Sequence, residues 1–364
     1  MVHELSGLTD ATLTQEEGGV ELRGDLLDAA GLCLWSRTPS GILVRIGRFR
    51  AKSLQQLHAE TKKLRWADVL FPGQPVRVRA TVKRSRIQRS DNAARKVELA
   101  ISDALKGTRR TGHKRVHHPV TVVVRIRGPE VILSVDAVGQ PLHRRGYRQA
   151  TAKAPLRENL AASVLVAVGW DPEEEALADP MCGSGTFGIE AALMAQDRAP
   201  GRKLRPAVLS WPSFPKKGWD QLKQQVDLPA NAPGVQIFAS DRNQGALAAA
   251  TGNAERAGVL RDIEFRCCAL GDPWDALPET GLVVVNPPYG KRIGDLGKIH
   301  GLYKHFGQKL AARYPGWRIA VVCPDKALAG RLAPGIEELV RFRNGGLPVG
   351  LYLGTIPRPQ PSAT

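Results

Sequence analysis

The alternation of hydrophobic and polar residues predicts short strands and two helices in the amino-terminal part of the chain. Residues 76–82 alternate apolar with mostly basic side chains, as a strand with one buried face does. The helix predicted at 92–105 would bury one stripe, formed by Ala94, Val97, Ile101 and Leu105. The other predicted strands are 41–47 and the hairpin 120–126 and 131–135, and the other predicted helix is 54–64. This mixture predicts a small α+β domain.

After Pro155 the pattern changes to apolar strands that alternate with amphipathic helices. This alternation predicts an α/β fold, with a mostly parallel sheet covered by helices on both faces. The predicted strands are 176–179, 236–241, 263–267, 282–285 and 317–323, and the predicted helices are 156–168, 186–194, 244–257 and 299–313. Two strands around Asn344-Gly-Gly346 predict an antiparallel hairpin at one edge. The pattern assigns no conformation to the insertion between Asp197 and Gly234.

The chain carries a large excess of positive charge. Its 364 residues include 52 Lys and Arg against 35 Asp and Glu, which gives a formal net charge of +17. This excess favours a polyanionic partner, because each phosphate that Lys or Arg neutralises releases a condensed counterion. General solubility would also account for the charge. Charge alone does not separate RNA, DNA and anionic lipid.

The cysteines predict neither disulfides nor a metal site. Cys33, Cys182, Cys267, Cys268 and Cys323 form no CxxC pair and have no His-rich partner segment. We interpret them as residues of a reduced protein without a bound metal. The sequence shows no signal peptide and no apolar run of about 18 residues, so we expect a soluble cytoplasmic protein without a membrane partner.

A glycine-containing segment follows the predicted strand 176–179 and opens the next helix. It reads Asp179-Pro-Met-Cys182-Gly183-Ser184-Gly185-Thr186. Glycines let the backbone approach a ligand closely, and the first turn of the helix offers free N–H groups. The match to GxGxxG is a weak signal by itself, because a tight structural turn uses the same residues.

The next acidic residue favours a nucleoside ligand over a dinucleotide or a triphosphate. A P-loop would require a Lys after the glycines, and a dinucleotide fold would place its ribose carboxylate about 20 residues on. Here the carboxylate is Asp241, at the end of the second predicted strand and 56 positions after Gly185. Its oxygens could accept hydrogen bonds from both ribose hydroxyls. Helix capping by Asp241 is the structural alternative and is compatible with this role.

The sequence Asn286-Pro287-Pro288-Tyr289 follows the apolar strand 282–285, at the sheet edge where open α/β folds bind ligands. An exocyclic base amine is a poor nucleophile because its lone pair is delocalised into the ring. If the Asn286 oxygen and the Pro287 carbonyl accept its N–H groups, the nitrogen can become pyramidal. Pro288 has no competing N–H, and Tyr289 could stack on the target ring. A Pro-Pro turn would explain the prolines but not the flanking Asn and Tyr.

These motifs together resemble the class I S-adenosylmethionine methyltransferases, and more narrowly the THUMP-domain RNA guanine-N2 methyltransferases. The matching segments are 142–148, 154–162, 179–186, 189–192, 197–201 and 286–290, which span most of the chain. The resemblance implies a Rossmann-like class I methyltransferase sheet preceded by a smaller α+β THUMP domain that binds RNA. It also implies methyl transfer from S-adenosyl-L-methionine to N2 of a guanosine in structured RNA, with rRNA favoured over tRNA.

The resemblance also implies domains and site residues. Residues 1–26 would be a remnant of an N-terminal ferredoxin-like segment, 27–138 the THUMP domain, 139–153 a linker and 154–358 the methyltransferase domain. Asn286, Pro287, Pro288 and Tyr289 would be catalytic. The cofactor would contact Asp179, Cys182, Gly183, Ser184, Gly185, Thr186, Asp241, Ala269 and Asp272.

Three features depart from the family pattern. Only about fifteen residues precede Glu16, where the family usually has an extra strand and helix, so we expect a truncated or misassigned start. The adenine-contacting Asp of the family falls near Ala269, so Asp272 or backbone groups would have to replace it. The sequence shows no second methyltransferase domain after this one, so we expect that the protein is not one of the fused bifunctional enzymes.

Two basic clusters in the amino-terminal part are candidates for RNA binding. The first cluster consists of Lys83, Arg84, Arg86, Arg89, Arg95 and Lys96. The second cluster consists of Lys106, Arg109, Arg110, Lys114 and Arg115. A charge run is often only a solvated surface. Aromatic residues make up 5% of the chain, so shape and phosphate contacts are favoured over base stacking.

Four other functions fit part of the pattern. An adenine-N6 methyltransferase acting on RNA or DNA would share the tetrad, although a DNA enzyme would not need an RNA-binding domain. A protein glutamine methyltransferase uses a similar tetrad on an amide. A dehydrogenase would fit the glycine loop but leaves the tetrad unexplained. A non-catalytic RNA-binding protein with a decayed cofactor site is the alternative outside the enzymes, and calorimetry with the cofactor would separate it from them.

Overall fold

The computed structural model describes residues 1–106, 119–149, 156–226, 234–272, 274, 276–289 and 296–358. The chain packs as two compact units. The amino-terminal unit consists of Met1–Leu142 and Gly201–Leu228, and the seven-stranded unit consists of His143–Pro200 and Pro229–Thr364. Each unit has its own main sheet and its own hydrophobic core.

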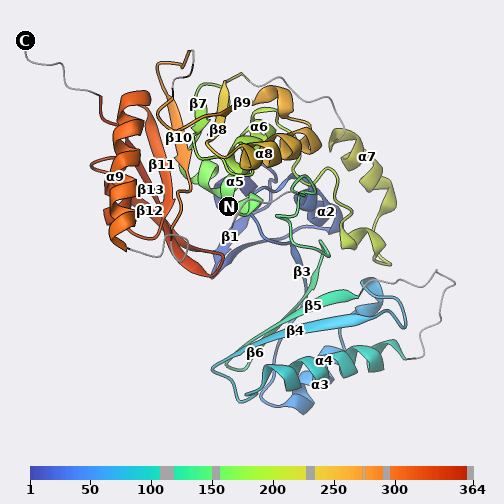
Figure 1. Ribbon diagram of the computed structural model, residues 1–364. Helices are drawn as coiled ribbons and strands as arrows, with labels where there is room; N and C mark the ends of the chain where they lie inside the picture. The colour runs from blue at the N-terminus through green and yellow to red at the C-terminus, as the bar shows by residue number, and fades with distance from the viewer. Residues whose placement is uncertain are drawn as a thin grey trace, which may run out of the picture. The chain divides into compact units, whose positions relative to one another are not determined.

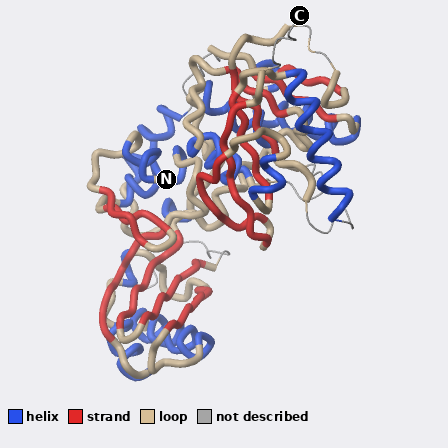
Figure 2. The backbone as a smooth tube through the Cα atoms, turned by 90° about the vertical axis from the view of Figure 1, so that its left-hand side faces the viewer, coloured by secondary structure: helices blue, strands red, loops and turns tan. Residues whose placement is uncertain are grey.

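A four-stranded sheet with the order β3-β6-β5-β4 forms the centre of the amino-terminal unit. Its strands are β3 (Leu43–Arg50), β4 (Val76–Lys83), β5 (Val120–Arg127) and β6 (Glu130–Asp136). β4 and β5 are parallel, whereas β6 is antiparallel to both of its neighbours. The helices α3 (Leu54–Lys62) and α4 (Ser90–Leu105) lie along one face of this sheet in Figures 1 and 2. The predicted strands and helices of this part are confirmed.

Alternate residues of these strands point into the core between the sheet and the two helices. Val124 and Leu133 are fully buried there, together with Leu57 of α3. The buried residues of α4 are Ala93, Val97, Ala100 and Ile101. The predicted stripe was therefore partly wrong, since Ala94 and Leu105 are only half-buried. A helix advances about 100° per residue, so the stripe that faces the sheet starts one position earlier than predicted.

The insertion after Asp197 packs into the amino-terminal unit, although its place in the chain put it inside the predicted methyltransferase domain. The further elements of this unit are α1 (Val2–Ser6), β1 (Leu13–Glu16), β2 (Gly19–Leu22), α2 (Leu26–Trp35), α7 (Lys216–Val226) and the 3-10 helices Trp66–Asp68 and Ala207–Ser210. Trp211 and Phe214 are buried in the same core as Cys33. A Cβ on Gly201 would lie 2.4 Å from the Cys33 carbonyl oxygen, so only glycine allows this close backbone approach.

The seven-stranded unit is built on a sheet with the order β12-β13-β11-β10-β7-β8-β9. Its strands are β7 (Ala176–Asp179), β8 (Ile237–Asp241), β9 (Glu264–Cys267), β10 (Gly281–Val285), β11 (Arg318–Cys323), β12 (Glu337–Asn344) and β13 (Leu347–Thr355). Its helices are α5 (Glu158–Ala167), α6 (Thr186–Ala195), α8 (Gln244–Ala257), α9 (Leu296–Arg313), α10 (Lys326–Gly330) and the 3-10 helix Leu260–Asp262. The strands β9, β8, β7, β10 and β11 are parallel, and β13 runs antiparallel to β11. This is the 3-2-1-4-5 order of a doubly wound fold, closed by a hairpin.

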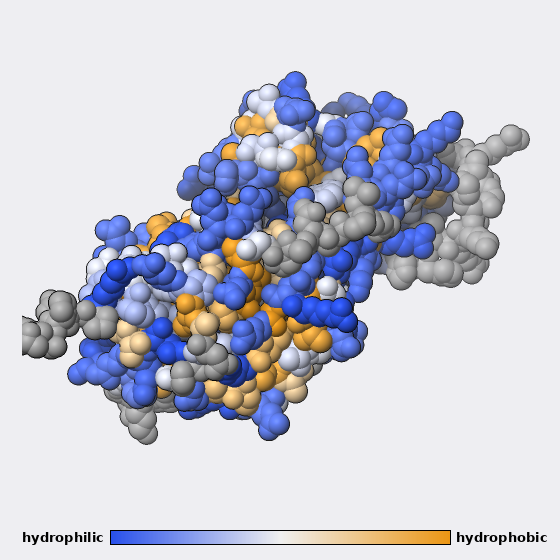
Figure 3. Space-filling view, turned by 90° about the horizontal axis from the view of Figure 1, so that it is seen from above, coloured by the Kyte–Doolittle hydropathy of each residue, from blue (hydrophilic) through white to orange (hydrophobic). Residues whose placement is uncertain are grey.

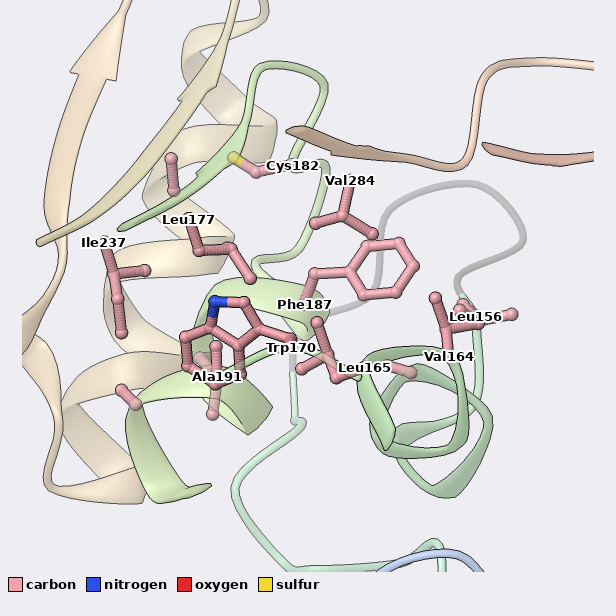
Figure 4. Packing of buried hydrophobic residues seen from close by; sticks show 14 of the residues in the cluster. Leu156, Val164, Leu165, Trp170, Leu177, Cys182, Phe187, Ala191, Ile237 and Val284 are labelled. Atoms are coloured by element: carbon pink, nitrogen blue, oxygen red, sulfur yellow. The ribbon is translucent and has the colours of Figure 1, made fainter. Parts of the chain in front are cut away.

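Helices cover both faces of this sheet, so its central strands are apolar at consecutive positions. In β10, Leu282 and Val284 belong to the core that faces α5, α6 and α8, whereas Val283 and Val285 belong to the core that faces α9 and α10. Figure 4 shows the ring of Phe187 between Val284 and side chains of α5. The predicted α/β architecture is confirmed.

Hydrophilic residues cover most of the face seen in Figure 3, with smaller hydrophobic areas between them. Scattered exposed apolar side chains are normal on folded proteins. Within the described ranges, none of the helices combines the length and the apolar composition that a membrane crossing requires.

Candidate active site

A cavity of about 870 Å³ lies at the carboxyl ends of β7, β8, β9 and β10. β7 leads into α6 on one face of the sheet and β10 is followed by α9 on the other, which makes this the switch point where doubly wound folds bind ligands. The predicted site residues that line the cavity are Asp179, Cys182, Gly183, Ser184, Thr186, Asp241, Ala269, Asp272, Asn286 and Pro288. Motifs far apart in the sequence are thus brought to one place.

The glycine loop takes a shape that other residues would strain. Gly183 has a φ of +54° and Gly185 a φ of +81°, both in the left-handed region. A Cβ on Gly185 would lie 3.0 Å from the Cβ of Ala250, so α6 and α8 can approach only because this position is glycine. The Cys182 N–H donates to the Ser240 carbonyl at 2.9 Å and ties the loop to β8. Gly185 shapes the loop and does not itself line the cavity.

Two carboxylates stand on the cavity wall. Asp241 accepts hydrogen bonds from the N–H groups of Gly183, at 3.0 Å, and of Asn243, at 2.9 Å. Asp179 is buried, which raises the pKa of its carboxyl to about 8, and the nearby charge of Asp241 also raises it. Helix capping does not explain Asp241, because the side chain that caps α8 is that of Asn243. Both carboxylates are therefore suited to a positively charged or hydroxyl-rich ligand.

Asn286 presents an unsatisfied acceptor at the cavity. Its Oδ1 is buried and has no hydrogen-bond partner within the described part of the chain. The same is true of the Ser184 hydroxyl in the glycine loop. The Tyr303 hydroxyl of α9 donates to the Pro288 carbonyl at 3.5 Å. Pro287 is buried and, unlike Asn286 and Pro288, does not line the cavity, and its carbonyl accepts no hydrogen bond from the residues that the structure describes.

Tyr289 does not line the cavity, unlike Asn286 and Pro288. Its ring is buried in the core that also contains Val284, and its hydroxyl accepts a hydrogen bond from the Asn344 side chain at 2.8 Å. Asn344 belongs to the β12–β13 hairpin, so a distant element holds this side of the turn. Sequence reasoning did not find this contact, because it depends on how the hairpin folds back on the sheet.

The far end of the cavity is formed by the turn after β9 and by α9. The Asp272 carboxylate accepts a hydrogen bond from the Ala269 N–H at 2.7 Å and so closes this turn. Side chains of α9 that sequence reasoning missed also line the cavity, namely Leu302, His305, Phe306 and Lys309. They follow the i, i+3, i+4, i+7 spacing of one helix face, which was a signal available in the sequence. Lys309 lies against Gly271, where a Cβ would come within 2.7 Å of its Cδ.

Buried charges connect the segment before α5 to the cavity. Arg148 donates to the Leu156 carbonyl at 2.6 Å and pairs with Glu158 at 3.1 Å. The same guanidinium nitrogen lies 3.4 Å from the Thr186 hydroxyl at the start of α6. Because Leu156 and Thr186 both line the cavity, Arg148 holds two parts of its wall together. This role was not predicted from the sequence.

The predicted RNA-binding residues lie in the amino-terminal unit. Lys83 ends β4, the loop after it carries Arg84, Arg86 and Arg89, and Arg95 and Lys96 lie on α4. All are exposed except Lys96, which is half-buried. In the second cluster, Lys106 pairs with Asp103 at 2.5 Å, and Arg109, Arg110, Lys114 and Arg115 lie outside the described residues.

The doubly wound sheet, the glycine loop after β7 and the Asn-Pro-Pro-Tyr turn after β10 define a class I methyltransferase fold and site. Residues 145–345 match the family described as RMKL-like, methyltransferase domain, and the chain belongs to this family.

Known proteins resemble almost the whole chain. The ribosomal RNA large subunit methyltransferase K/L of Syntrophotalea carbinolica is 34% identical over 362 residues, which cover 95% of this chain and 50% of that protein. The chain thus spans about half the length of the curated relatives it matches.

Two solved structures share the fold. A predicted N6-adenine-specific DNA methylase from Listeria monocytogenes is 29% identical, with a TM-score of 0.84 over 96% of this chain and 91% of that one. A possible methylase from Clostridium difficile is 28% identical, with a TM-score of 0.84 over 100% of this chain and 96% of that one.

Proposed function

We propose that this chain transfers a methyl group from S-adenosyl-L-methionine to the exocyclic N2 amine of a guanosine in ribosomal RNA. The observation that carries the proposal is the buried, unpartnered Oδ1 of Asn286 on the cavity wall. An unsatisfied buried acceptor destabilises a protein by about 1–3 kcal/mol, so its presence at a cavity calls for a ligand that donates. A base amine is such a donor.

The cavity suits S-adenosyl-L-methionine. Its volume of about 870 Å³ falls within the usual range of small-molecule sites. Asp179 and Asp241 favour a cationic ligand, and Asp241 keeps acceptor capacity for ribose hydroxyls. The Ser184 hydroxyl is buried and unpartnered at the same wall. When bound, the cofactor supplies a methyl group that is already activated on a positively charged sulfur.

The protein's contribution to the chemistry is to orient and localise the lone pair of the amine. Asn286 Oδ1 would accept one N–H and the Pro287 carbonyl the other, which favours a pyramidal nitrogen. Pro288 cannot compete, because it has no N–H and its carbonyl already accepts from Tyr303. Tyr289 would have to leave its bond to Asn344 to stack on the base, so we assign it first to holding the turn.

Ribosomal RNA and guanine are favoured over the alternatives. The curated relatives are named as ribosomal RNA large subunit methyltransferases, and the net charge of +17 suits a polyanion. We assign residues 27–138 to a THUMP domain that binds this RNA. Adenine N6 is the second candidate target, because the tetrad would accept that amine equally well and one solved relative is described as a predicted N6-adenine-specific DNA methylase.

The product decides between these targets. The purified chain would be incubated with methyl-labelled S-adenosyl-L-methionine and large-subunit RNA, and the digested nucleosides would be separated by mass spectrometry. We expect the label in N2-methylguanosine. Label in N6-methyladenosine would overturn the guanine assignment and leave the amine chemistry, and the absence of labelled nucleosides would overturn the proposed function of this chain.

A further inference from the structure

The open face of the four-stranded sheet in the amino-terminal unit is covered with basic side chains. α3 and α4 pack on the other face, and outward residues alternate with buried ones along β4 and β5. The outward basic residues are Arg45, Arg48, Arg50, Arg77, Arg79, Lys83, Arg125 and Arg127. Of these, only Lys83 belongs to the cluster predicted from the sequence.

Acidic residues neutralise part of this face, around Arg45 and Arg48 of β3 and around Arg127 at the end of β5. Arg45 pairs with Glu21 of β2, and Arg127 pairs with Glu17 at 3.1 Å, next to the β1–β2 turn. Arg48 pairs with Glu130 of β6 at 2.7 Å. These ion pairs lie within the amino-terminal unit and account for Arg45, Arg48 and Arg127 as structural contacts, whereas the exposed Arg50 at the end of β3 pairs with none of the described residues.

The rest of the face, on β4 and on β5 before Arg127, has no such counter-charges among the residues that the structure describes. Arg77, Arg79, Lys83 and Arg125 are exposed and form no ion pair with any residue that the structure describes. In the register of the parallel pair, Arg125 lies opposite Thr81, between Arg79 and Lys83. Outward residues two apart on a strand are separated by about 6.7 Å, so these like charges repel one another. Because no acidic residue that the structure describes offsets this repulsion, the surface indicates an anionic ligand.

We propose that the part of the sheet face formed by Arg77, Arg79, Lys83 and Arg125 binds the sugar–phosphate backbone of the substrate RNA. The inference rests on the proposed function, because it takes RNA as the substrate. Guanidinium groups donate paired hydrogen bonds to phosphate oxygens, and the Thr81 hydroxyl between them is a further donor. The surface contains no aromatic side chain, so it reads phosphate positions and not bases.

A polyanion fits this surface better than a protein partner does. Protein interfaces have an apolar centre, and none of the large apolar residues that are exposed in the described ranges lies on β4 or β5. The basic strip also continues into the loop with Arg84, Arg86 and Arg89, which lengthens it beyond a single phosphate site. Among polyanions, the relatives' ribosomal RNA favours RNA over an anionic membrane.

The test compares two variants that lose the same charge. Arg77→Gln, Arg79→Gln and Arg125→Gln are combined in one protein, and Lys62→Gln, Lys63→Gln and Arg65→Gln, at the end of α3, form the matched control. Binding of labelled large-subunit RNA is measured between 50 and 200 mM salt. For the sheet variant, the plot of the logarithm of the RNA-binding constant against the logarithm of the salt concentration should become shallower, with a slope about 2–3 smaller in magnitude than that of the wild type. The control should change much less.

Stability and charge readouts separate this role from a structural one. The three Gln substitutions remove the repulsion between the like charges on β4 and β5. The melting temperature of the sheet variant at low salt should therefore equal or exceed that of the wild type. Arg77→Lys, Arg79→Lys and Arg125→Lys together should keep most of the salt slope, since the charges remain. A lower melting temperature in the Gln variant, equal losses in both Gln variants, or stronger binding of the wild type to anionic phospholipid vesicles than to RNA would overturn the inference.

Methyl transfer distinguishes failure of this inference from failure of the proposed function. If the wild type methylates RNA and the sheet variant keeps the wild-type salt slope, the surface assignment is wrong and the function stands. If the wild type binds RNA with the expected slope but yields no labelled nucleoside, the proposed function is wrong and the surface assignment stands.

Discussion

At the scale of single residues, the carboxyl groups of Asp179 and Asp241 favour a cationic ligand in the cavity. Asp179 is buried and its pKa is raised to about 8, so it is mostly protonated at neutral pH when no cation is near. A cationic ligand favours the ionised form. In the free protein this group therefore contributes stability that is greatest near pH 4 and is lost as the pH rises through 8.

Cofactor affinity should consequently depend on pH through Asp179. Between pH 6 and 7.5 we expect the affinity for S-adenosyl-L-methionine to rise by up to about tenfold per pH unit, because one proton must leave before the cation binds. Calorimetry over this range measures the slope. Asp179→Asn should bind weakly and show a flat profile, while its melting temperature at pH 8 should exceed that of the wild type. A pH-independent wild-type affinity would contradict this account of the acid pair.

Asp179, Asp241 and Asn286 could be identified from the sequence because the first two end an apolar strand and Asn286 directly follows one, and the ends of parallel strands meet at one edge of a sheet. Tyr289 was harder to place. Its position next to the prolines suggested a stacking surface, but the direction of its ring is set by Asn344 of the β12–β13 hairpin, 55 residues further along the chain. A contact of this kind is not encoded in local spacing.

At the scale of elements, the glycine loop depends on backbone conformation more than on side chains. Gly185→Ala would place a Cβ at a φ of +81° and 3.0 Å from Ala250 Cβ. We expect the free energy of unfolding to fall by roughly 1–3 kcal/mol and cofactor affinity to weaken, because the loop must shift. Urea unfolding and calorimetry measure both effects.

Gly301→Ala on α9 is the matched control for this substitution. Nothing lies within 4 Å of a Cβ at this position, and alanine is favoured over glycine inside a helix by about 1 kcal/mol. The control should therefore be as stable as the wild type or more so and should bind the cofactor normally. Equal stability of the Gly185→Ala and Gly301→Ala proteins would refute the role assigned to the loop.

Most elements were predictable from the sequence because apolar periodicity is local. The predicted strands of the seven-stranded sheet agree with the structure, and α8 has the bounds that the pattern predicted. The face of α9 that lines the cavity was missed, although its spacing was visible. Which face of a helix points to a cavity and which to the sheet is decided by packing, and in α9 Tyr303 and Leu310 take the buried positions.

At the scale of the whole molecule, the two compact units do not follow the chain in order. The segment Gly201–Leu228 lies between elements of the seven-stranded unit in sequence but packs with the amino-terminal unit through Trp211 and Phe214. Domain boundaries drawn along the sequence could not reveal this exchange, because composition does not show with which core a segment packs. The basic surface on β4 and β5 was likewise not predicted, because the alternation of apolar and basic residues at 76–82 was interpreted only as the pattern of a half-buried strand.

We propose that methyl transfer and RNA binding belong to different units, and this predicts that the two can be separated by substitution. The cavity and Asn286 belong to the seven-stranded unit, whereas the proposed RNA surface belongs to the amino-terminal unit. A substitution of Asn286, the proposed acceptor of the target amine, should therefore change the rate of methyl transfer without changing the affinity for RNA or cofactor.

The single-turnover rate of Asn286→Ala tests the central claim, that the Asn286 oxygen accepts the base amine during methyl transfer. Saturating cofactor and RNA would be mixed rapidly with wild type or variant, and both binding constants would be measured in parallel. Loss of one preorganised contact in a transition state lowers a rate by about a hundred- to a thousandfold, so we expect that decrease with unchanged binding constants. A variant that methylates RNA at the wild-type rate would contradict the account.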